Sequence, residues 1–108
     1  GRSGAPAARL ENDETMKTSI ALCTYNGEKF LAEQLESFLR QTKLPDELII
    51  CDDLSTDSTS EILKDFIKKS PFPVRLEINR EQLGVVKNFE KAISLCTEEI
   101  ILLSDQDD

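Results

Sequence analysis

Four short apolar segments alternate with three segments of helical periodicity, and this alternation constrains the fold more than any other feature of the sequence. The apolar segments cover residues 18–23, 47–51, 74–78 and 100–103. The segments of helical periodicity cover residues 28–42, 58–69 and 85–96. Short apolar runs are typical of buried strands, and strands that alternate with helices form a parallel sheet with right-handed crossovers. The sequence therefore predicts an α/β fold, β-α-β-α-β-α-β, with a mostly parallel sheet.

Local patterns refine this prediction. Apolar and charged residues alternate over residues 74–78, which is typical of a half-exposed strand at the edge of a sheet. Ser58 and Glu61 stand at the spacing of a capping box and predict the start of the second helix. The apolar stripes predict the buried helix faces: Phe30, Leu31, Leu35, Phe38 and Leu39; Ile62, Leu63, Phe66 and Ile67; and Val85, Val86, Phe89, Ala92, Ile93 and Cys96.

The charge balance and the cysteine pattern exclude several classes of protein. The chain has 21 acidic and 13 basic residues, so it lacks the basic face with which proteins bind nucleic acid. No apolar run reaches the roughly 18 residues that a membrane span needs. The chain has no histidine, and its three cysteines form no CxxC pair. The ligands of a typical zinc site and the residue for histidine-based catalysis are therefore missing from the sequence. We expect free thiols in a reducing cytoplasm.

The first fifteen residues differ in character from the rest of the chain. Residues 1–15 are polar, rich in glycine, alanine and proline, and without the apolar centre of a signal peptide. Met16 follows them and precedes the first predicted strand. We therefore expect residues 1–15 to be a tag or a disordered leader, and residues 16–108 to form the domain.

Carboxylates gather where two of the predicted strands end. Asp52 and Asp53 follow the second strand, and Asp105, Asp107 and Asp108 follow the fourth. In a parallel sheet these ends lie on one edge, which is where ligands of open α/β sheets bind. Clustered carboxylates repel one another unless a cation lies between them, and their oxygens suit Mg²⁺ or Mn²⁺. The sequence thus predicts a divalent metal site, which could bridge a diphosphate and stabilise it as a leaving group.

Individual residues near these strand ends have simpler interpretations as well. Acidic residues are common in turns after strands, and Asp57 fits a turn or a helix start. Tyr25 suits either stacking on a ring or packing, whereas Lys87 and Arg80 suit either a phosphate or solvent. Asp53 offers an acceptor for an N–H group of a base. Two other site types are excluded: a dinucleotide site would need GxGxxG after the first strand, and a phospho-acceptor receiver domain would have its acidic pair there.

Taken together, these motifs resemble the inverting family 2 glycosyltransferases, which have the GT-A fold. The similarity covers residues 17–108 and is carried by CTYNGE at 23–28, DDLSTDST at 52–59, SDQDD at 104–108, and Asn79, Gly84 and Asn88. The wording of the first and last motifs is most similar to rhamnosyltransferase-type members.

The resemblance implies a Rossmann-like, nucleotide-binding half of a GT-A domain and assigns roles to particular residues. It implies a nucleotide site formed by Thr24, Tyr25, Asn26, Glu28, Asp53, Lys87 and Asp105. Within this site, Tyr25 and Asp53 would hold the base. It also implies a Mg²⁺ or Mn²⁺ site formed by Asp105, Asp107 and Asp108. Leu54 stands where the family usually has glycine, and we expect an altered turn there because leucine disfavours a positive φ.

The implied activity is transfer of a sugar, with inversion, from a UDP- or dTDP-linked donor to a saccharide or lipid-linked acceptor in polysaccharide synthesis. The family's catalytic base lies downstream of the position of Asp108. We therefore expect a truncated part of a cytoplasmic enzyme, membrane-peripheral in its full length, that is inactive alone and self-associates through uncovered apolar surface. Two alternatives stay open: a non-catalytic nucleotide-binding or interaction module of the same fold, and a structural Ca²⁺ site at the strand ends.

Overall fold

The computed structural model describes residues 16–105, and the expected leader at residues 1–15 lies outside them, as do residues 106–108. The elements follow in the order β1 (Thr18–Thr24), α2 (Glu28–Leu39), β2 (Glu47–Asp52), α3 (Thr59–Lys69), β3 (Val74–Ile78), α4 (Val85–Leu95) and β4 (Ile100–Asp105). The predicted alternation of strands and helices is confirmed. The ends differ slightly, since α2 ends at Leu39 rather than at Thr42 and β4 continues to Asp105.

The four strands form one sheet in the order β3-β2-β1-β4, and every neighbouring pair is parallel. The register places Cys23 of β1 opposite both Cys51 of β2 and Asp105 of β4. The prediction that β3 is an edge strand is confirmed. Because all four strands run the same way, their carboxyl ends meet on one side of the sheet. We call this side the strand-end rim, formed by residues 24–28, 52–59, 79–84 and 104–105.

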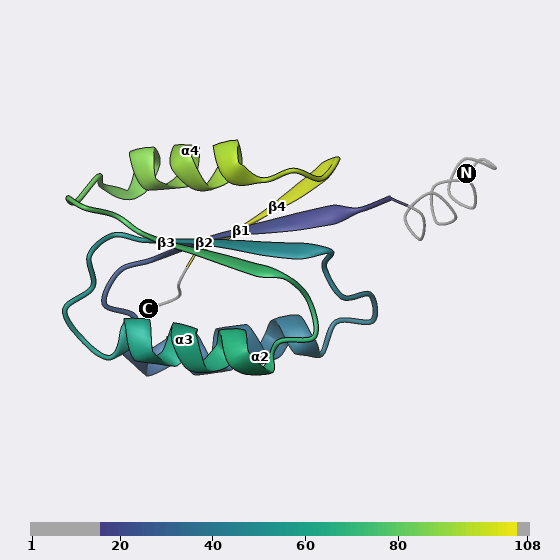
Figure 1. Cartoon of the computed structure of the whole chain (residues 1–108), viewed down its shortest axis with the longest axis horizontal. Coiled ribbons are helices and arrows are strands. Elements are labelled where there is room, and N and C mark those ends of the chain that lie inside the picture. Colours follow the sequence, from purple (N-terminus) through teal and green to yellow (C-terminus); the bar gives the residue numbers. More distant parts are fainter. Residues whose placement is uncertain (1–15, 106–108) are drawn as a thin grey trace.

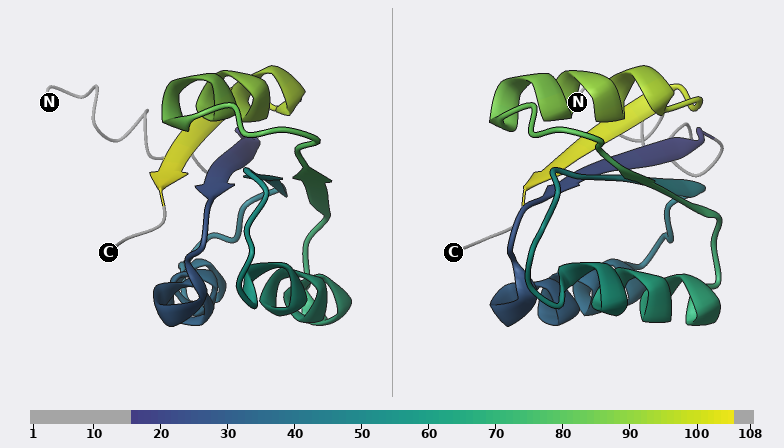
Figure 2. Two further views of the ribbon diagram at one scale, coloured as in Figure 1. Left: turned by 90° about the vertical axis from the view of Figure 1, so that its left-hand side faces the viewer. Right: turned by 60° about the vertical axis from the view of Figure 1, so that its left-hand side comes forward.

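Helices cover both faces of the sheet, with α2 and α3 on one face and α4 on the other (Figures 1 and 2). The core under α2 and α3 consists of Ile20, Leu22, Leu31, Leu35, Phe38, Leu48, Ile50, Leu63 and Phe72. The core under α4 is smaller and consists of Ala21, Cys23, Cys51 and Ala92, with Phe89, Leu95, Cys96 and Ile101 packed against it. Side chains alternate along β1 and β2, so each strand contributes to both cores.

The helix faces differ in part from the predicted stripes. Leu31, Leu35 and Phe38 are buried as expected, but Phe30 is exposed. On α4 the prediction was wrong for Val85, Val86 and Ile93, which are exposed, whereas the polar Asn88 is buried. The reason is that α4 is oriented by polar contacts: the Asn88 amide nitrogen donates to the Cys51 carbonyl at 2.9 Å, which turns this side of the helix toward the sheet.

The predicted capping box at the start of α3 is not formed, because the Ser58 side chain makes no capping hydrogen bond. The carboxylate of Asp57 takes this role instead and accepts the Thr59 backbone N–H at 2.9 Å. A charged acceptor at a helix N-terminus makes a stronger hydrogen bond than a hydroxyl does. The prediction that Asp57 lies at a turn or a helix start is confirmed.

Two further predictions concern the cysteines and the membrane. Cys23 and Cys51 are buried, Cys96 is half-buried, and none of the three forms a disulfide within the described residues. Within residues 16–105, no helix combines the length and the apolar character that crossing a membrane would need.

Candidate functional site

The strand-end rim is built on a buried carboxylate at the end of β2. Asp52 is 1% exposed and accepts the Thr24 hydroxyl at 2.6 Å, the Ser55 backbone N–H at 2.9 Å and the Ser55 hydroxyl at 2.6 Å. These bonds join the end of β1 to the turn that follows β2. Buried carboxylates need such donors to offset their desolvation. Asp52 and Thr24 therefore form the buried base on which the loops of the strand-end rim rest.

The turn after Asp53 is left-handed at Leu54, where φ is 64°. The expectation of an altered turn was therefore wrong: the chain keeps the positive φ although the residue is not glycine. The two hydrogen bonds from Ser55 to Asp52 hold the turn in this shape. A left-handed conformation costs a leucine roughly 1–2 kcal/mol, which the neighbouring contacts must offset.

The loop after β1 and the loop after β2 are hydrogen-bonded to each other along their length. The Asn26 backbone N–H donates to the Ser55 hydroxyl at 2.8 Å, and the Asn26 side-chain oxygen accepts the Thr56 N–H at 2.7 Å. The Glu28 carboxylate accepts the Ser58 N–H at 2.7 Å. Asn26 and Glu28 were predicted to shape the nucleotide pocket, and their side-chain oxygens bind the facing loop.

Asp57 strengthens the same connection. Its carboxylate accepts the Glu28 N–H at 3.2 Å and the Thr59 N–H at 2.9 Å. Burial opposes ionisation, but the hydrogen bonds from Thr59 and Glu28 outweigh it and lower the pKa of Asp57. The carboxylate is thus held in its charged form between the two loops.

Asp53 lies at the centre of the rim and receives three hydrogen bonds. Its Oδ1 accepts the Asn79 side-chain amide at 2.9 Å and the Leu83 backbone N–H at 2.7 Å, and its Oδ2 accepts the Gly84 N–H at 3.0 Å. Burial opposes its ionisation, but these donors prevail and lower the pKa of Asp53. A carboxylate has about four acceptor positions, so Oδ2 retains one after these three bonds.

The partners of Asp53 form a longer network that reaches α4. The Asn79 amide nitrogen also donates to the Asn88 side-chain oxygen at 2.8 Å, and the Asn79 oxygen accepts the Lys91 ammonium at 2.7 Å. Asn79 and Asn88 are each 2% exposed. The network therefore connects the end of β2, the loop after β3 and α4 through buried polar groups.

Two other predicted nucleotide contacts, Tyr25 and Lys87, are exposed to solvent. Tyr25, directly after β1, is 44% exposed, and Lys87 is exposed in the first turn of α4. The start of α4 lies at the rim because Gly84 donates to Asp53. The structure thus brings Thr24, Tyr25, Asn26, Glu28, Asp53 and Lys87 to one side of the sheet, although Asn26 and Glu28 bind the facing loop.

The predicted metal ligands fall largely outside the described residues. The backbone of Asp105 ends β4 opposite Cys23, which places this position at the rim. Asp107 and Asp108 lie outside the described residues. Within residues 16–105, no group of three or more histidine, cysteine or acidic residues is arranged to hold a metal ion. The metal site stays a prediction.

The roles of Asn79, Asn88 and Lys91 were not predicted from the sequence. Asn79 and Asn88 were matched as family positions without a function, and Lys91 was not singled out. A signal for Asn88 was present, because it is three residues after Val85 and four before Ala92, on the apolar stripe of the third helix. A polar residue on such a stripe needs a buried partner.

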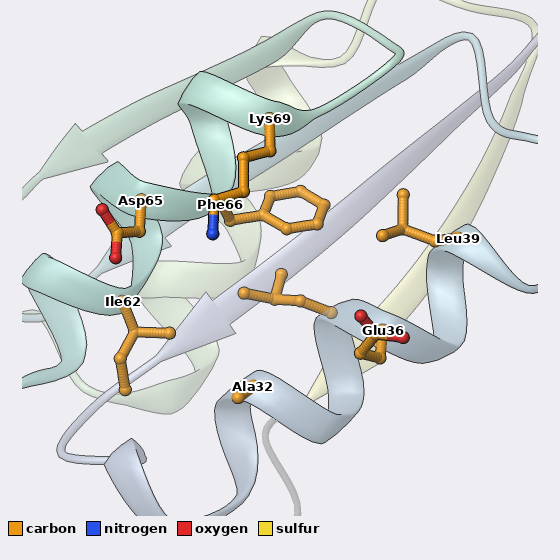
Figure 3. Close-up of a pocket in the computed structure, with 8 residues that line it drawn as sticks. Ala32, Glu36, Leu39, Ile62, Asp65, Phe66 and Lys69 are labelled. Atoms are coloured by element: carbon orange, nitrogen blue, oxygen red, sulfur yellow. The ribbon is translucent and has the colours of Figure 1, made fainter.

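A groove of about 330 Å³ lies elsewhere, between α2 and α3 (Figure 3). Its apolar lining comes from Ala32, Leu35, Leu39, Ile62 and Phe66, with Glu36, Asp65 and Lys69 as charged residues around it. None of these residues belongs to the strand-end rim. The groove is thus separate from the candidate site.

Comparison with known proteins identifies the family. The family model for glycosyl transferase family 2 matches residues 19–108. The chain belongs to this family. It is 36% identical over 91 residues to the dTDP-rhamnosyl transferase RfbG of Shigella flexneri, covering 81% of this chain and 32% of RfbG.

Solved structures agree with the predicted GT-A fold. The structure of Staphylococcus aureus TarS 1–349 in complex with UDP superposes with a TM-score of 0.75 at 30% identity, over 85% of this chain and 28% of that chain. The mannosyltransferase PcManGT from Pyrobaculum calidifontis, solved with GDP-Man and Mn²⁺, has a TM-score of 0.73 at 23% identity, over 85% and 28% of the two chains. The chain thus spans about a third or less of the length of these proteins.

Proposed function

We propose that this chain is the donor-binding part of a glycosyltransferase that transfers a sugar from a nucleotide diphosphate to an acceptor hydroxyl. Membership of glycosyl transferase family 2 supports glycosyl transfer, and the UDP bound to TarS supports a nucleotide-linked donor. The observation that carries the proposal is the remaining acceptor position on Oδ2 of Asp53, a charged carboxylate held at the strand-end rim.

The chemistry of Asp53 selects among the bases. An ionised carboxylate only accepts hydrogen bonds. The exocyclic amino groups of cytosine and adenine can donate to it as well, but an acceptor that faces the middle of the pairing edge favours a base with a ring N–H there. Uracil, thymine and guanine have such a group, whereas the ring nitrogens of cytosine and adenine at the pairing edge are acceptors. If a ring nitrogen with a lone pair faced Asp53, the largely buried carboxylate would lack a donor at this position, which costs free energy. Asp53 thus favours uracil, thymine or guanine, and among these the UDP bound to TarS and the similarity to a dTDP-rhamnosyl transferase support a UDP- or dTDP-linked donor.

The neighbouring rim residues have complementary roles in this proposal. The exposed ring of Tyr25 stacks on the base, because aromatic faces bind bases with little dependence on sequence. Lys87, in the first turn of α4, lies near the nucleotide phosphates. Thr24, Asn26 and Glu28 act indirectly, because their hydrogen bonds hold the loops that carry Tyr25 and Asp53.

A divalent metal belongs to the same proposal. Asp105 ends β4 at the rim, and Asp107 and Asp108 follow closely in the sequence. Their donor atoms are all carboxylate oxygens, the ligand type that Mg²⁺ and Mn²⁺ prefer. Asp105, Asp107 and Asp108 would hold the metal, which when bound neutralises charge on the departing diphosphate.

The complete reaction needs groups beyond those at the rim. We propose inversion by direct displacement, with a base outside this chain removing the proton of a saccharide or lipid-linked acceptor in polysaccharide synthesis. In this proposal the described residues contact the donor, and the base lies outside them. We accordingly expect negligible sugar transfer by the 108-residue chain.

Calorimetric titration of this chain with UDP, dTDP, GDP, CDP and ADP, each with and without Mn²⁺ or Mg²⁺, tests the proposal. We expect metal-enhanced binding of the first three and weak binding of CDP and ADP. Tyr25→Ala should weaken binding without loss of fold because the side chain is exposed. The control is Lys64→Met, an exposed change on α3 away from the rim. The absence of nucleotide binding by the folded chain, or equal binding of all five, would contradict the proposal. Binding of Ca²⁺ alone would favour the structural alternative.

A further inference from the structure

Lys91 holds a specific position in the network behind Asp53. It lies on α4, one turn after Asn88, and its ammonium donates to the side-chain oxygen of Asn79 at 2.7 Å. The side chain is half-buried, so the ammonium is partly removed from water. Ordering a lysine side chain costs conformational entropy, and the contact with Asn79 must outweigh this cost. We therefore expect the contact to have a defined role.

The contact fixes the orientation of the Asn79 amide. A lysine ammonium is only a donor, so the Asn79 atom that faces it must be the oxygen. The amide nitrogen then faces the opposite way and donates to both Asp53 and Asn88. Reversal of the amide would place the oxygen against the Asp53 carboxylate and the nitrogen against the ammonium. Lys91 and Asp53 thus define the same orientation from opposite sides.

Lys91 also supplies positive charge to a carboxylate that has no direct ionic partner among the residues that the structure describes. The ion pairs within residues 16–105 are Arg40–Glu36, Lys43–Asp46 and Arg75–Glu77, and none includes Asp53. Lys91 acts on Asp53 electrostatically through the intervening amide. Hydrogen bonds in such a chain polarise one another in a low dielectric, which strengthens the bond to the carboxylate.

We propose that Lys91 is a positioning residue for nucleotide recognition: through Asn79 it holds Asp53 so that Oδ2 points its remaining acceptor position at the ring N–H of the base. This inference rests on the proposed nucleotide site and extends it to a residue on α4. Lys91 itself does not touch the nucleotide. Lys87, one turn earlier and exposed, is the candidate for direct contact.

Three substitutions separate the positive charge of Lys91 from its role as a hydrogen-bond donor. Lys91→Arg keeps the charge and the donor, Lys91→Gln keeps a donor without charge, and Lys91→Met keeps neither. Lys64→Met on α3 is the control, because it removes an exposed lysine by the same change. The measurement is the UDP dissociation constant of the full chain with Mn²⁺, with folding checked by urea denaturation of each variant.

We expect Lys91→Met to weaken UDP binding about tenfold, since losing a charge-assisted hydrogen bond behind the acceptor costs on the order of 1.4 kcal/mol. The UDP affinity of Lys91→Gln should lie between that of Lys91→Met and that of the wild type, and Lys91→Arg should retain most of the wild-type affinity. The backbone amide resonances of Leu83 and Gly84, which donate to Asp53, should shift in Lys91→Met before any nucleotide is added. A merely stabilising role would lower the urea midpoint and leave these two resonances and the affinity of the folded protein unchanged.

The outcomes also distinguish this inference from the proposed function. Wild-type binding of UDP that Lys91→Met keeps unchanged would overturn the role of Lys91 and leave the nucleotide site standing. Failure of the folded wild-type chain to bind any nucleotide would overturn the site and, with it, this inference. A tenfold loss in Lys91→Met that Lys91→Arg does not recover would also overturn it, because the charge and the donor would then not be what matters.

Discussion

Asn79 and Asp53 are joined by a 2.9 Å hydrogen bond that connects the loop after β3 to the end of β2. The Asn79 backbone adds a second connection, because its N–H donates to the Asp52 carbonyl at 2.9 Å. Asn79 therefore fixes both the path of the chain and the position of the carboxylate.

The first prediction concerns Asn79→Ala. The substitution removes the donor from Asp53 and the partners of Asn88 and Lys91, all in a largely buried setting. We expect the free energy of unfolding to fall by about 2 kcal/mol, because unsatisfied buried polar groups bear their full desolvation cost. Urea denaturation followed by circular dichroism measures this. The matched control is Glu81→Ala in the same loop, which is exposed and should change stability little. Equal effects of the two substitutions would contradict the role given to Asn79.

The second prediction concerns the left-handed turn at Leu54. At a φ of 64° alanine is strained and glycine is not, so Leu54→Gly should be more stable than Leu54→Ala by about 1 kcal/mol. At Leu44, which is exposed and has no positive φ, the order should reverse because glycine raises the entropy of the unfolded chain. Thermal denaturation of the four variants is sufficient. The same order at both positions would rule out strain at Leu54.

The third prediction concerns acid stability. The pKa values of Asp53, Asp57 and Glu47 are lowered in the folded chain by hydrogen bonds that prevail over burial, from ordinary values of 3.8, 3.8 and 4.5. A carboxylate with a depressed pKa stabilises the fold fully above its ordinary pKa and loses this effect as the pH falls through its folded value. The urea midpoint should therefore stay level from pH 7 to about pH 5 and decrease below it.

Asp57→Asn tests the same point at one residue. Its stability deficit relative to the wild type should be largest at neutral pH and shrink toward pH 3, because the wild-type carboxylate then becomes protonated. Asp65→Asn, an exposed carboxylate change on α3, is the matched control. A deficit for Asp57→Asn that does not vary with pH would contradict the assigned hydrogen bonds.

The fourth prediction is self-association through β4. Leu102 and Leu103 on this edge strand are 46% and 61% exposed, whereas the opposite edge strand, β3, carries the exposed ion pair of Arg75 and Glu77. Charged residues protect an edge strand from pairing, and exposed apolar residues do not. We expect concentration-dependent association by sedimentation equilibrium, which Leu103→Lys reduces. A wild-type chain that stays monomeric at high concentration would count against this expectation.

The helices and strands, and the end of the sheet that carries the site, were predictable from the sequence alone. Strand and helix patterns depend on residues near one another in the chain, so the α/β alternation and the grouping of Thr24, Tyr25 and Asp53 at the strand ends could be predicted. The family followed from motifs at 23–28, 52–59 and 104–108. These are local properties of the chain.

The hydrogen bonds that connect the site depend on the packing of distant segments and could not be predicted. The sequence separates Asp53 from Asn79, and Asn79 from Lys91, so their hydrogen bonds depend on how β3 and α4 pack against β2. The same packing buries Asn88 and exposes Val85, contrary to the apolar stripe. It also holds Leu54 at a φ that its own preference opposes. Contacts between distant segments outweigh local propensities at these positions because each buried polar group must find a partner in space.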